Sequence, residues 1–160
     1  MIYMGLSFFL LGLAIFLFSM WFFVTILGGD VRYLLDIASL LMIILPLVAV
    51  LTATRSFRVF FGGLQAVISP QKAVSDELRG QAASLFRYLS KTTGLVMVIS
   101  VFISWTNMLF NLNFADAGGL AMIGLNLAAA LITPLQGLIL IAAVFEPMVF
   151  ILKRRSAKER

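Results

Sequence analysis

The residues of this chain that could take part in chemistry are polar and small side chains inside two long apolar stretches. Ser100, Ser104 and Asn107 recur at helical spacing in the first stretch, and Asn126 and Thr133 share one face of the second. Because residues three or four positions apart lie on one face of a helix, each set forms a stripe. Such a stripe either packs helices together or lines a path for ions, and the pattern leaves both open. The full set is Ser100, Ser104, Asn107, Asn126, Ala130, Thr133, Pro134 and Gly137.

Ionisable groups are nearly missing from these stretches. Asp36 is predicted at the outer end of a helix, with Ser39 three residues on, so its carboxylate can cap the helix start. Glu146 is predicted near the inner membrane surface, where it can form an ion pair with Lys153 or with an Arg of a neighbouring chain. No acid falls at the centre of a predicted span, so this chain alone has no proton relay. If ions cross, the titrating carboxylate belongs to a partner.

The absence of His and Cys narrows the function classes. It removes thiolate nucleophiles, Cys/His metal sites and the commonest general base. No pair of carboxylates is predicted inside the membrane either. We therefore expect no enzyme, no metal and no cofactor. The net charge of +5 bears on membrane orientation and does not indicate nucleic-acid binding.

The composition indicates an integral membrane protein. Hydrophobic residues make up 62% of the 160 positions and charged residues only 12%, against about 25% charged residues in soluble domains. With roughly 20 residues per span, this length accommodates four transmembrane helices. We predict an all-α fold in which residues 1–160 form a single four-helix membrane domain. The predicted helices cover about 4–27, 34–68, 71–112 and 120–153.

Each predicted helix has a distinguishing feature. The first is apolar on every face, which favours a retained, peripheral span over a cleaved signal peptide. The second contains Pro46, a predicted kink, and becomes amphipathic beyond Arg55. Residues 71–91 predict a surface amphipathic helix, either a solvated connector or a docking segment, that runs into the third span. The fourth, with ~33 residues and about 50 Å of length, exceeds the roughly 30 Å hydrocarbon core and should project into the cytoplasm.

The basic residues predict the orientation. Of the 12 Lys and Arg residues, all except Arg32 lie between Arg55 and Lys91 or in the tail from Lys153 to Arg160. Positively charged segments stay on the cytoplasmic side of a membrane. Both of these segments, and both termini, are therefore predicted to be cytoplasmic.

Three short motifs occur in order along the chain: DIASLL at 36–41, NMLFNL at 107–112 and IGLNLAAALITPLQG at 123–137. Pro147 and the basic residues at 153–155 follow them. In sequence and order they resemble the MotA branch of the MotA/TolQ/ExbB family of ion-driven motor subunits. In that branch the second helix opens with D-x-A-S-L-L, the third ends in a pattern like NML-x-NL, and the fourth carries I-G-P-x-x-A-x-A-L-x-T-T-L-x-G.

The resemblance implies a subunit of the bacterial inner membrane. Five copies would form a homo-oligomer, a pentamer, around two copies of a single-span MotB/TolR/ExbD-like partner. The partner's aspartate would carry H+, or less readily Na+, and the ion flow would drive mechanical work. In this family the third and fourth helices line the pore and the first two lie outside in the lipid bilayer. The stripe residues would then face the partner.

Two departures from the family pattern support a second hypothesis. Pro134 stands at the second position of the family's Thr pair, of which Thr133 is retained. The segment from Arg55 to Lys91 is also much shorter than the cytoplasmic loop with which flagellar members engage the rotor. The alternative is a non-conducting scaffold or assembly subunit that uses the same helix faces for packing only.

Overall fold

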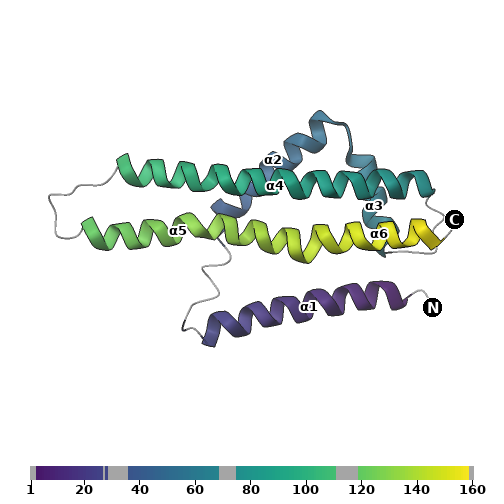
Figure 1. Ribbon diagram of the computed structural model, residues 1–160, viewed down its shortest axis with the longest axis horizontal. Helices are drawn as coiled ribbons and strands as arrows, with labels where there is room; N and C mark the ends of the chain where they lie inside the picture. The colour runs from purple at the N-terminus through teal and green to yellow at the C-terminus, as the bar shows by residue number, and fades with distance from the viewer. Residues whose placement is uncertain (1–2, 27, 29–35, 69–74, 111–118, 159–160) are drawn as a thin grey trace.

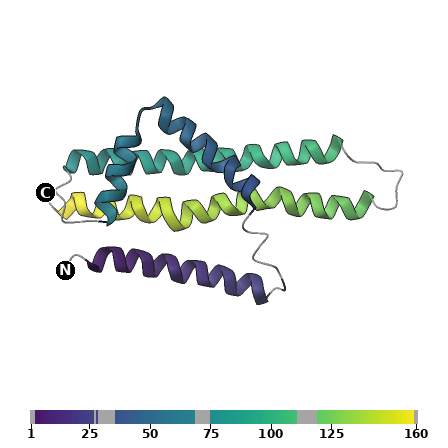
Figure 2. The same ribbon diagram turned by 180° about the vertical axis from the view of Figure 1, so that it is seen from behind.

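The computed structural model is built on two long antiparallel rods of helix, which Figure 1 and Figure 2 show from opposite sides. It describes residues 3–26, 28, 36–68, 75–110 and 119–158. Within these ranges every regular element is a helix and there is no strand, so the fold is all-α as predicted. The elements are α1 (Tyr3–Ile26), α2 (Ile37–Ala53), α3 (Phe57–Ile68), α4 (Asp76–Phe110), α5 (Gly119–Leu140), η2 (Ile141–Phe145) and α6 (Glu146–Lys158).

The first rod is α4, and the second consists of α5, η2 and α6 in succession. α4 packs against both α5 and α6, so the rods stay in contact along their length. η2 is a π-helical segment that ends two residues before Pro147, and the N–H of Glu146 donates to the carbonyl of Ile141, five residues back. Pro147 has no N–H to give, and the wider turn lets the helix continue past this interruption. The predicted fourth helix is therefore observed as one rod from 119 to 158.

The predicted second helix, 34–68, is divided into α2 and α3, whose axes are bent by 113°. α2 ends in a Schellman turn, in which the Ser56 N–H donates to the Leu51 carbonyl at 3.0 Å and the Arg55 N–H to the Thr52 carbonyl at 3.1 Å. Arg55 takes the left-handed conformation, with φ of 52°. Such turns normally place Gly at this position, so the sequence carries no signal for the break.

The other helix bounds lie close to the predicted ones. α1 begins and ends one residue before the predicted 4–27, and α2 runs through Pro46 as a single helix. α4 begins at Asp76, and it joins the predicted surface helix and third span without interruption. Residues 27, 34, 35, 69–74 and 111–118 lie outside the described residues.

Within the described residues, three helical segments are long and apolar enough to cross a membrane. They cover 9–26, 76–110 and 126–154, and the bent pair α2–α3 adds a fourth only if it is counted as one span. No described side chain from 9 to 26 is buried, and the main contacts of α1 are with α3 and η2 at the side of the rods. This is the arrangement that an apolar helix facing lipid adopts.

The core lies where α3 crosses the two rods. The ring of Phe86 on α4 sits 5.4 Å from Phe60 on α3 and 6.3 Å from Phe145 on η2, measured between centroids. α3 approaches α4 closely at Gly63, where an added Cβ would lie 2.7 Å from the Cβ of Ala82. Small residues thus let the backbone of α3 dock on α4, and the aromatic rings fill the space beside the contact.

Candidate functional site

A pocket of about 320 Å³ lies where the two polar stripes meet the first turns of α2. α4 contributes the hydroxyl of Ser104 and the amide of Asn107, and α5 contributes the amide of Asn126 and the hydroxyl of Thr133. α2 packs against both helices at this point. The lining residues are Ala38, Ser39, Met42, Ser104, Asn107, Met108, Asn126, Ala129, Ala130 and Thr133.

Five of the eight stripe residues therefore lie around this pocket, and three do not. Ser100 is buried, and its hydroxyl donates to the Met97 carbonyl of its own helix at 2.7 Å. Gly137 is covered by Met97 and Thr93 of α4, so that a Cβ at this position would overlap the Met97 side chain. Pro134 is half-buried in α5 beside Thr133 but does not line the pocket. Ser100 and Gly137 thus pack the two rods together.

Sequence reasoning did not assign α2 to this pocket. Ala38, Ser39 and Met42 close one side of it. The one residue of this side that the sequence singles out is Ser39, whose position three residues after Asp36 predicts a helix start. That helix start is confirmed, because the Ser39 N–H donates to Asp36 Oδ2 at 2.9 Å. The position of α2 over the stripes depends on tertiary contacts, including a hydrogen bond of 3.2 Å from Gln136 Nε2 on α5 to the backbone carbonyl of Asp36.

The Asp36 carboxyl precedes the first residue of α2 and is used to cap it. Hydrogen bonds from the side chain and the backbone of Ser39 lower its pKa below the ordinary value of 3.8. The carboxylate is therefore ionised at neutral pH and occupied by the helix N-terminus. Its observed role is to cap the N-terminus of α2.

The other acid of interest, Glu146, has a partner that the sequence did not indicate. In place of the predicted ion pair with Lys153, its Oε1 accepts a hydrogen bond of 3.3 Å from the Ser90 hydroxyl on α4. Ser90 is buried between the rods. An ion pair found in the described part of the chain joins Arg79 to Asp76 at 3.2 Å within α4. Glu146 thus links the two rods near the π-helical turn.

The chemistry available in the pocket is hydrogen bonding. Its lining offers hydroxyls and amides, and no lining residue can titrate. A pocket of about 320 Å³ has room for several waters or for a side chain from a neighbouring element.

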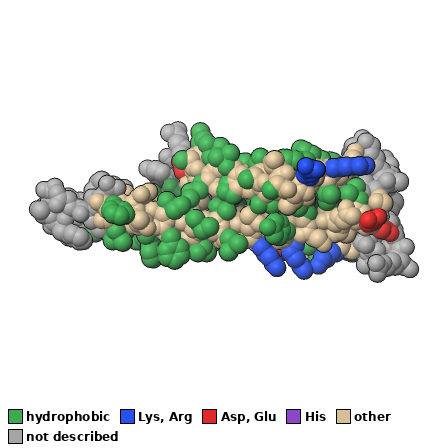
Figure 3. All heavy atoms as spheres, turned by 90° about the horizontal axis from the view of Figure 1, so that it is seen from above, with side chains coloured by type: hydrophobic (Ala, Val, Ile, Leu, Met, Phe, Trp, Pro, Cys, Tyr) green, Lys and Arg blue, Asp and Glu red, His purple; other side chains and the backbone are tan. Residues whose placement is uncertain are grey.

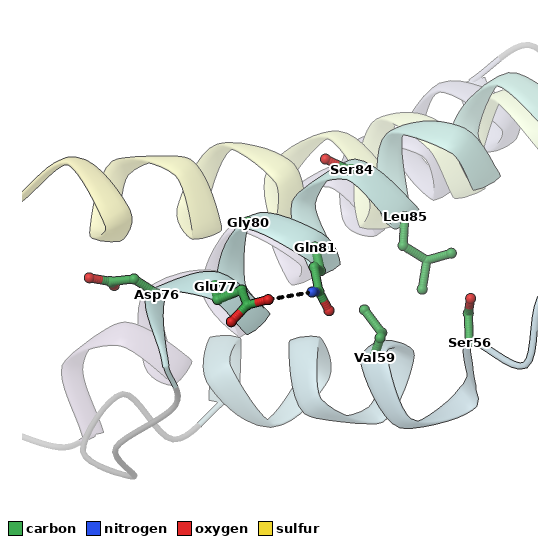
Figure 4. A pocket seen from close by; sticks show the side chains of 8 residues that line it. All are labelled: Ser56, Val59, Asp76, Glu77, Gly80, Gln81, Ser84 and Leu85. Atoms are coloured by element: carbon green, nitrogen blue, oxygen red, sulfur yellow. Dashed lines mark hydrogen bonds between the residues drawn. The ribbon is translucent and has the colours of Figure 1, made fainter.

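A second pocket of about 680 Å³ lies between α3 and the start of α4 (Figure 4). Ser56, which directly precedes α3, and Val59 of α3 line one side, while the acidic residues Asp76 and Glu77 lie along its α4 side. Glu77 accepts a hydrogen bond of 3.2 Å from Gln81 on the next turn. Because both acids are already paired within α4, this pocket offers no free charge cluster.

No group of three His, Cys, Asp or Glu residues that could hold a metal ion occurs in the described part of the chain. Comparisons of the chain with models of protein families, with curated proteins and with solved structures found no match.

Proposed function

We propose that this chain is a subunit of an ion-driven motor or energiser of the MotA/TolQ/ExbB type in the bacterial inner membrane. Copies assemble as a pentamer around a single-span partner whose aspartate carries H+, or less readily Na+. The observation that carries the proposal is the pocket at which the two stripes meet. It is polar, it lies in the apolar part of the rods, and it lacks a group that can titrate.

In this proposal the chain crosses the membrane four times. α1, α4 and the second rod are long enough to do so, and α2, with 17 residues, lies at the short end of the range for a span. In Figure 1, α3, the first half of α4 and α6 lie at the same end of the rods. These segments and the turn before α3 carry the described basic residues of the ranges from Arg55 to Lys91 and from Lys153. By the positive-inside rule that end, with both termini, is cytoplasmic.

The pocket would receive the side chain of the partner's aspartate. The hydroxyl of Thr133 and the amides of Asn107 and Asn126 can donate hydrogen bonds to a carboxylate, and their oxygens can accept one from a protonated carboxyl group. Stabilising both protonation states at one place is what a proton-carrying group needs as it loads and unloads. The pocket has room for this side chain together with waters, and the partner's helix would lie beside it.

Pro134 changes the polar groups near this pocket. Because proline has no N–H, the carbonyl of Ala130 does not receive the regular helical hydrogen bond from residue 134. Ala130 lines the pocket. Where the family pattern has a second Thr hydroxyl, this chain would offer a backbone acceptor, which suits a protonated carboxyl group or a water.

The first test is identification of the partner. Purification of the full chain in a mild detergent, followed by mass spectrometry of the intact complex, should give five copies with a single-span protein that has an acid in its span. A monomer or dimer without such a protein would contradict the proposal.

The second test uses Thr133. Thr133→Val should abolish proton uptake, followed with a pH-sensitive dye in vesicles that contain the purified complex, while the assembly stays intact. Thr133→Ser should restore it. The matched control is Thr106→Val, because Thr106 is exposed on α4 and its hydroxyl bonds to its own-helix Phe102 carbonyl at 2.8 Å. Full proton uptake in Thr133→Val would exclude Thr133 from an ion path.

A second candidate function is a non-conducting scaffold or assembly subunit. It is favoured by Ser100 and Gly137, which are buried between α4 and α5 of the same chain and are therefore not available to a partner. In that case Thr133→Val would weaken assembly, and no proton uptake would be found with the unaltered complex.

A further inference from the structure

α3 has an exposed surface that is divided into an apolar flank and a polar flank. Its buried side packs on α4 through Gly63, Ala66 and Val67. Successive residues of a helix advance by about 100° around the axis. The positions of α3 that flank this contact on either side can therefore be assigned from the sequence. One flank carries Phe57, Phe61, Leu64 and Ile68, and the opposite flank carries Arg58, Gly62 and Gln65.

Three of the four residues of the apolar flank are exposed, while Leu64 packs against the core. The exposed fraction is 62% for Phe61, 44% for Ile68 and 39% for Phe57. A solvent-facing helix would place polar residues there, as α3 does on its other flank. A helix with one apolar and one charged flank is typical of a segment that lies in the plane of a membrane surface.

Contacts with α4 show which way each flank points. A Cβ at Gly62, on the polar flank, would lie 3.0 Å from Leu78, near the start of α4. Further round the helix, Gly63 and Phe60 face Phe86, two turns deeper along α4. The polar flank therefore faces the end of the molecule at which α4 begins. The apolar flank faces the opposite way, toward the part of α4 that spans the membrane.

Lys and Arg side chains gather at the end of the rods where α3 packs on α4, as Figure 1 and Figure 3 show. Beyond them, as far as Trp105, the exposed residues of α4 are apolar, among them Leu95, Val98 and Phe102. The exposed basic residues at this level are Arg55, Arg58, Arg87, Lys91, Lys153 and Arg154.

We propose that α3 lies in the bilayer surface at this basic end, bound to anionic phospholipid. The apolar flank sits among the acyl chains, and Arg58 contacts headgroup phosphates. The bend of 113° at Arg55 turns the chain from a spanning direction into this plane. The inference rests on membrane embedding of the rods and is independent of ion conduction, so the failure of either proposal leaves the other standing.

The position of α3 can be tested with spin labels, because the chain contains no Cys. Single labels at the adjacent positions Phe61→Cys and Gly62→Cys, about 100° apart around the helix, would be compared in vesicles of phosphatidylcholine and phosphatidylglycerol. Phe102→Cys provides a lipid reference and Glu77→Cys an aqueous one. The label at 61 should collide with oxygen several-fold more than with a water-soluble nickel chelate, as at 102, and the label at 62 should do the reverse, as at 77.

Two results would overturn the proposal. Accessibility of the label at 61 to the nickel chelate would place the flank in water. Protection of that label from both reagents would show that protein, such as a second copy of this chain, covers it.

The role of anionic lipid has its own test. The label at Phe61→Cys should sit deeper in vesicles with phosphatidylglycerol than in phosphatidylcholine alone, and Arg58→Gln should remove this difference. Arg154→Gln, which lowers the charge by the same amount on α6, should leave it in place. Equal depth in both lipids, or a difference that survives Arg58→Gln, would show that α3 does not recognise anionic headgroups.

Discussion

The side chain of Gln136, near the C-terminal end of α5, donates a hydrogen bond of 3.2 Å to the backbone carbonyl of Asp36, 100 positions earlier. The same carbonyl accepts the N–H of Leu40 at 3.1 Å, the first turn of α2. Gln136 is buried. This contact holds the start of α2 against α5, one turn away from Thr133, and so keeps α2 over the polar pocket.

Gln136→Leu should loosen the first turn of α2. A hydrogen bond of this kind contributes about 1 kcal/mol, and the substitution leaves the rest of α5 apolar and helical. Hydrogen exchange of the amides at residues 39–41 should accelerate, with little change in α4. Gln81→Leu is the control, because Gln81 is exposed and bonds to Glu77 on its own helix. Unchanged exchange in Gln136→Leu would mean that α2 is held by packing alone.

Stability should fall in acid partly because of Asp36. The pKa of its carboxyl group is lower in the folded chain than the ordinary value of 3.8. The ionised carboxylate therefore stabilises the fold at pH values above 3.8. That contribution is lost as the pH falls through the lower, folded value. Asp36→Asn keeps a capping oxygen but cannot titrate, so its unfolding temperature should fall less over this range than that of the unaltered chain. Parallel curves for the two proteins would show that the cap does not contribute to acid lability.

Gly63→Ala should detach α3 from α4. The added methyl group would lie 2.7 Å from the Cβ of Ala82, which is fixed to the backbone, and 2.8 Å from the ring of Phe86. Overpacking of this kind costs about 1–3 kcal/mol. The measurement is the unfolding temperature in detergent, with near-ultraviolet circular dichroism as a report on the aromatic cluster.

The matched control for this substitution is Gly80→Ala. Gly80 is exposed on α4, and an added Cβ meets nothing within 4 Å. This variant should gain up to about 1 kcal/mol from helix propensity. If both variants behaved alike, the close approach of α3 to α4 would not be a determinant of the fold.

The bend at Arg55 should depend on tolerance of a positive φ and not on the charge of the side chain. The left-handed conformation of Arg55 costs about 1–2 kcal/mol of folding free energy. Arg55→Gly should therefore raise the unfolding temperature, Arg55→Asn should be tolerated and Arg55→Val should lower it. Because all three remove the same charge, their order isolates the backbone effect. A similar loss in all three would assign the role of Arg55 to its guanidinium group instead.

Much of the architecture follows from local patterns. The cap at Asp36, the amphipathic character beyond Arg55 and the long fourth helix could be read from spacing and composition, because each depends on residues within a few turns. The stripes were also visible, since helical periodicity alone places Ser104 with Asn107. The break between α2 and α3 was not, because an Arg occupies the turn position at which Gly would have signalled it.

What the sequence by itself determined is an all-α chain with helices apolar enough for a membrane, and a set of polar residues on two helix faces. Only the tertiary structure decided what those faces meet. Five stripe residues surround a pocket closed by α2, while Ser100 and Gly137 are buried between the rods, and Glu146 bonds to Ser90. The physical reason is that periodicity gives the direction of a side chain around its own helix. The partner across the gap is chosen by close packing and by hydrogen bonds between residues as far apart as Asp36 and Gln136.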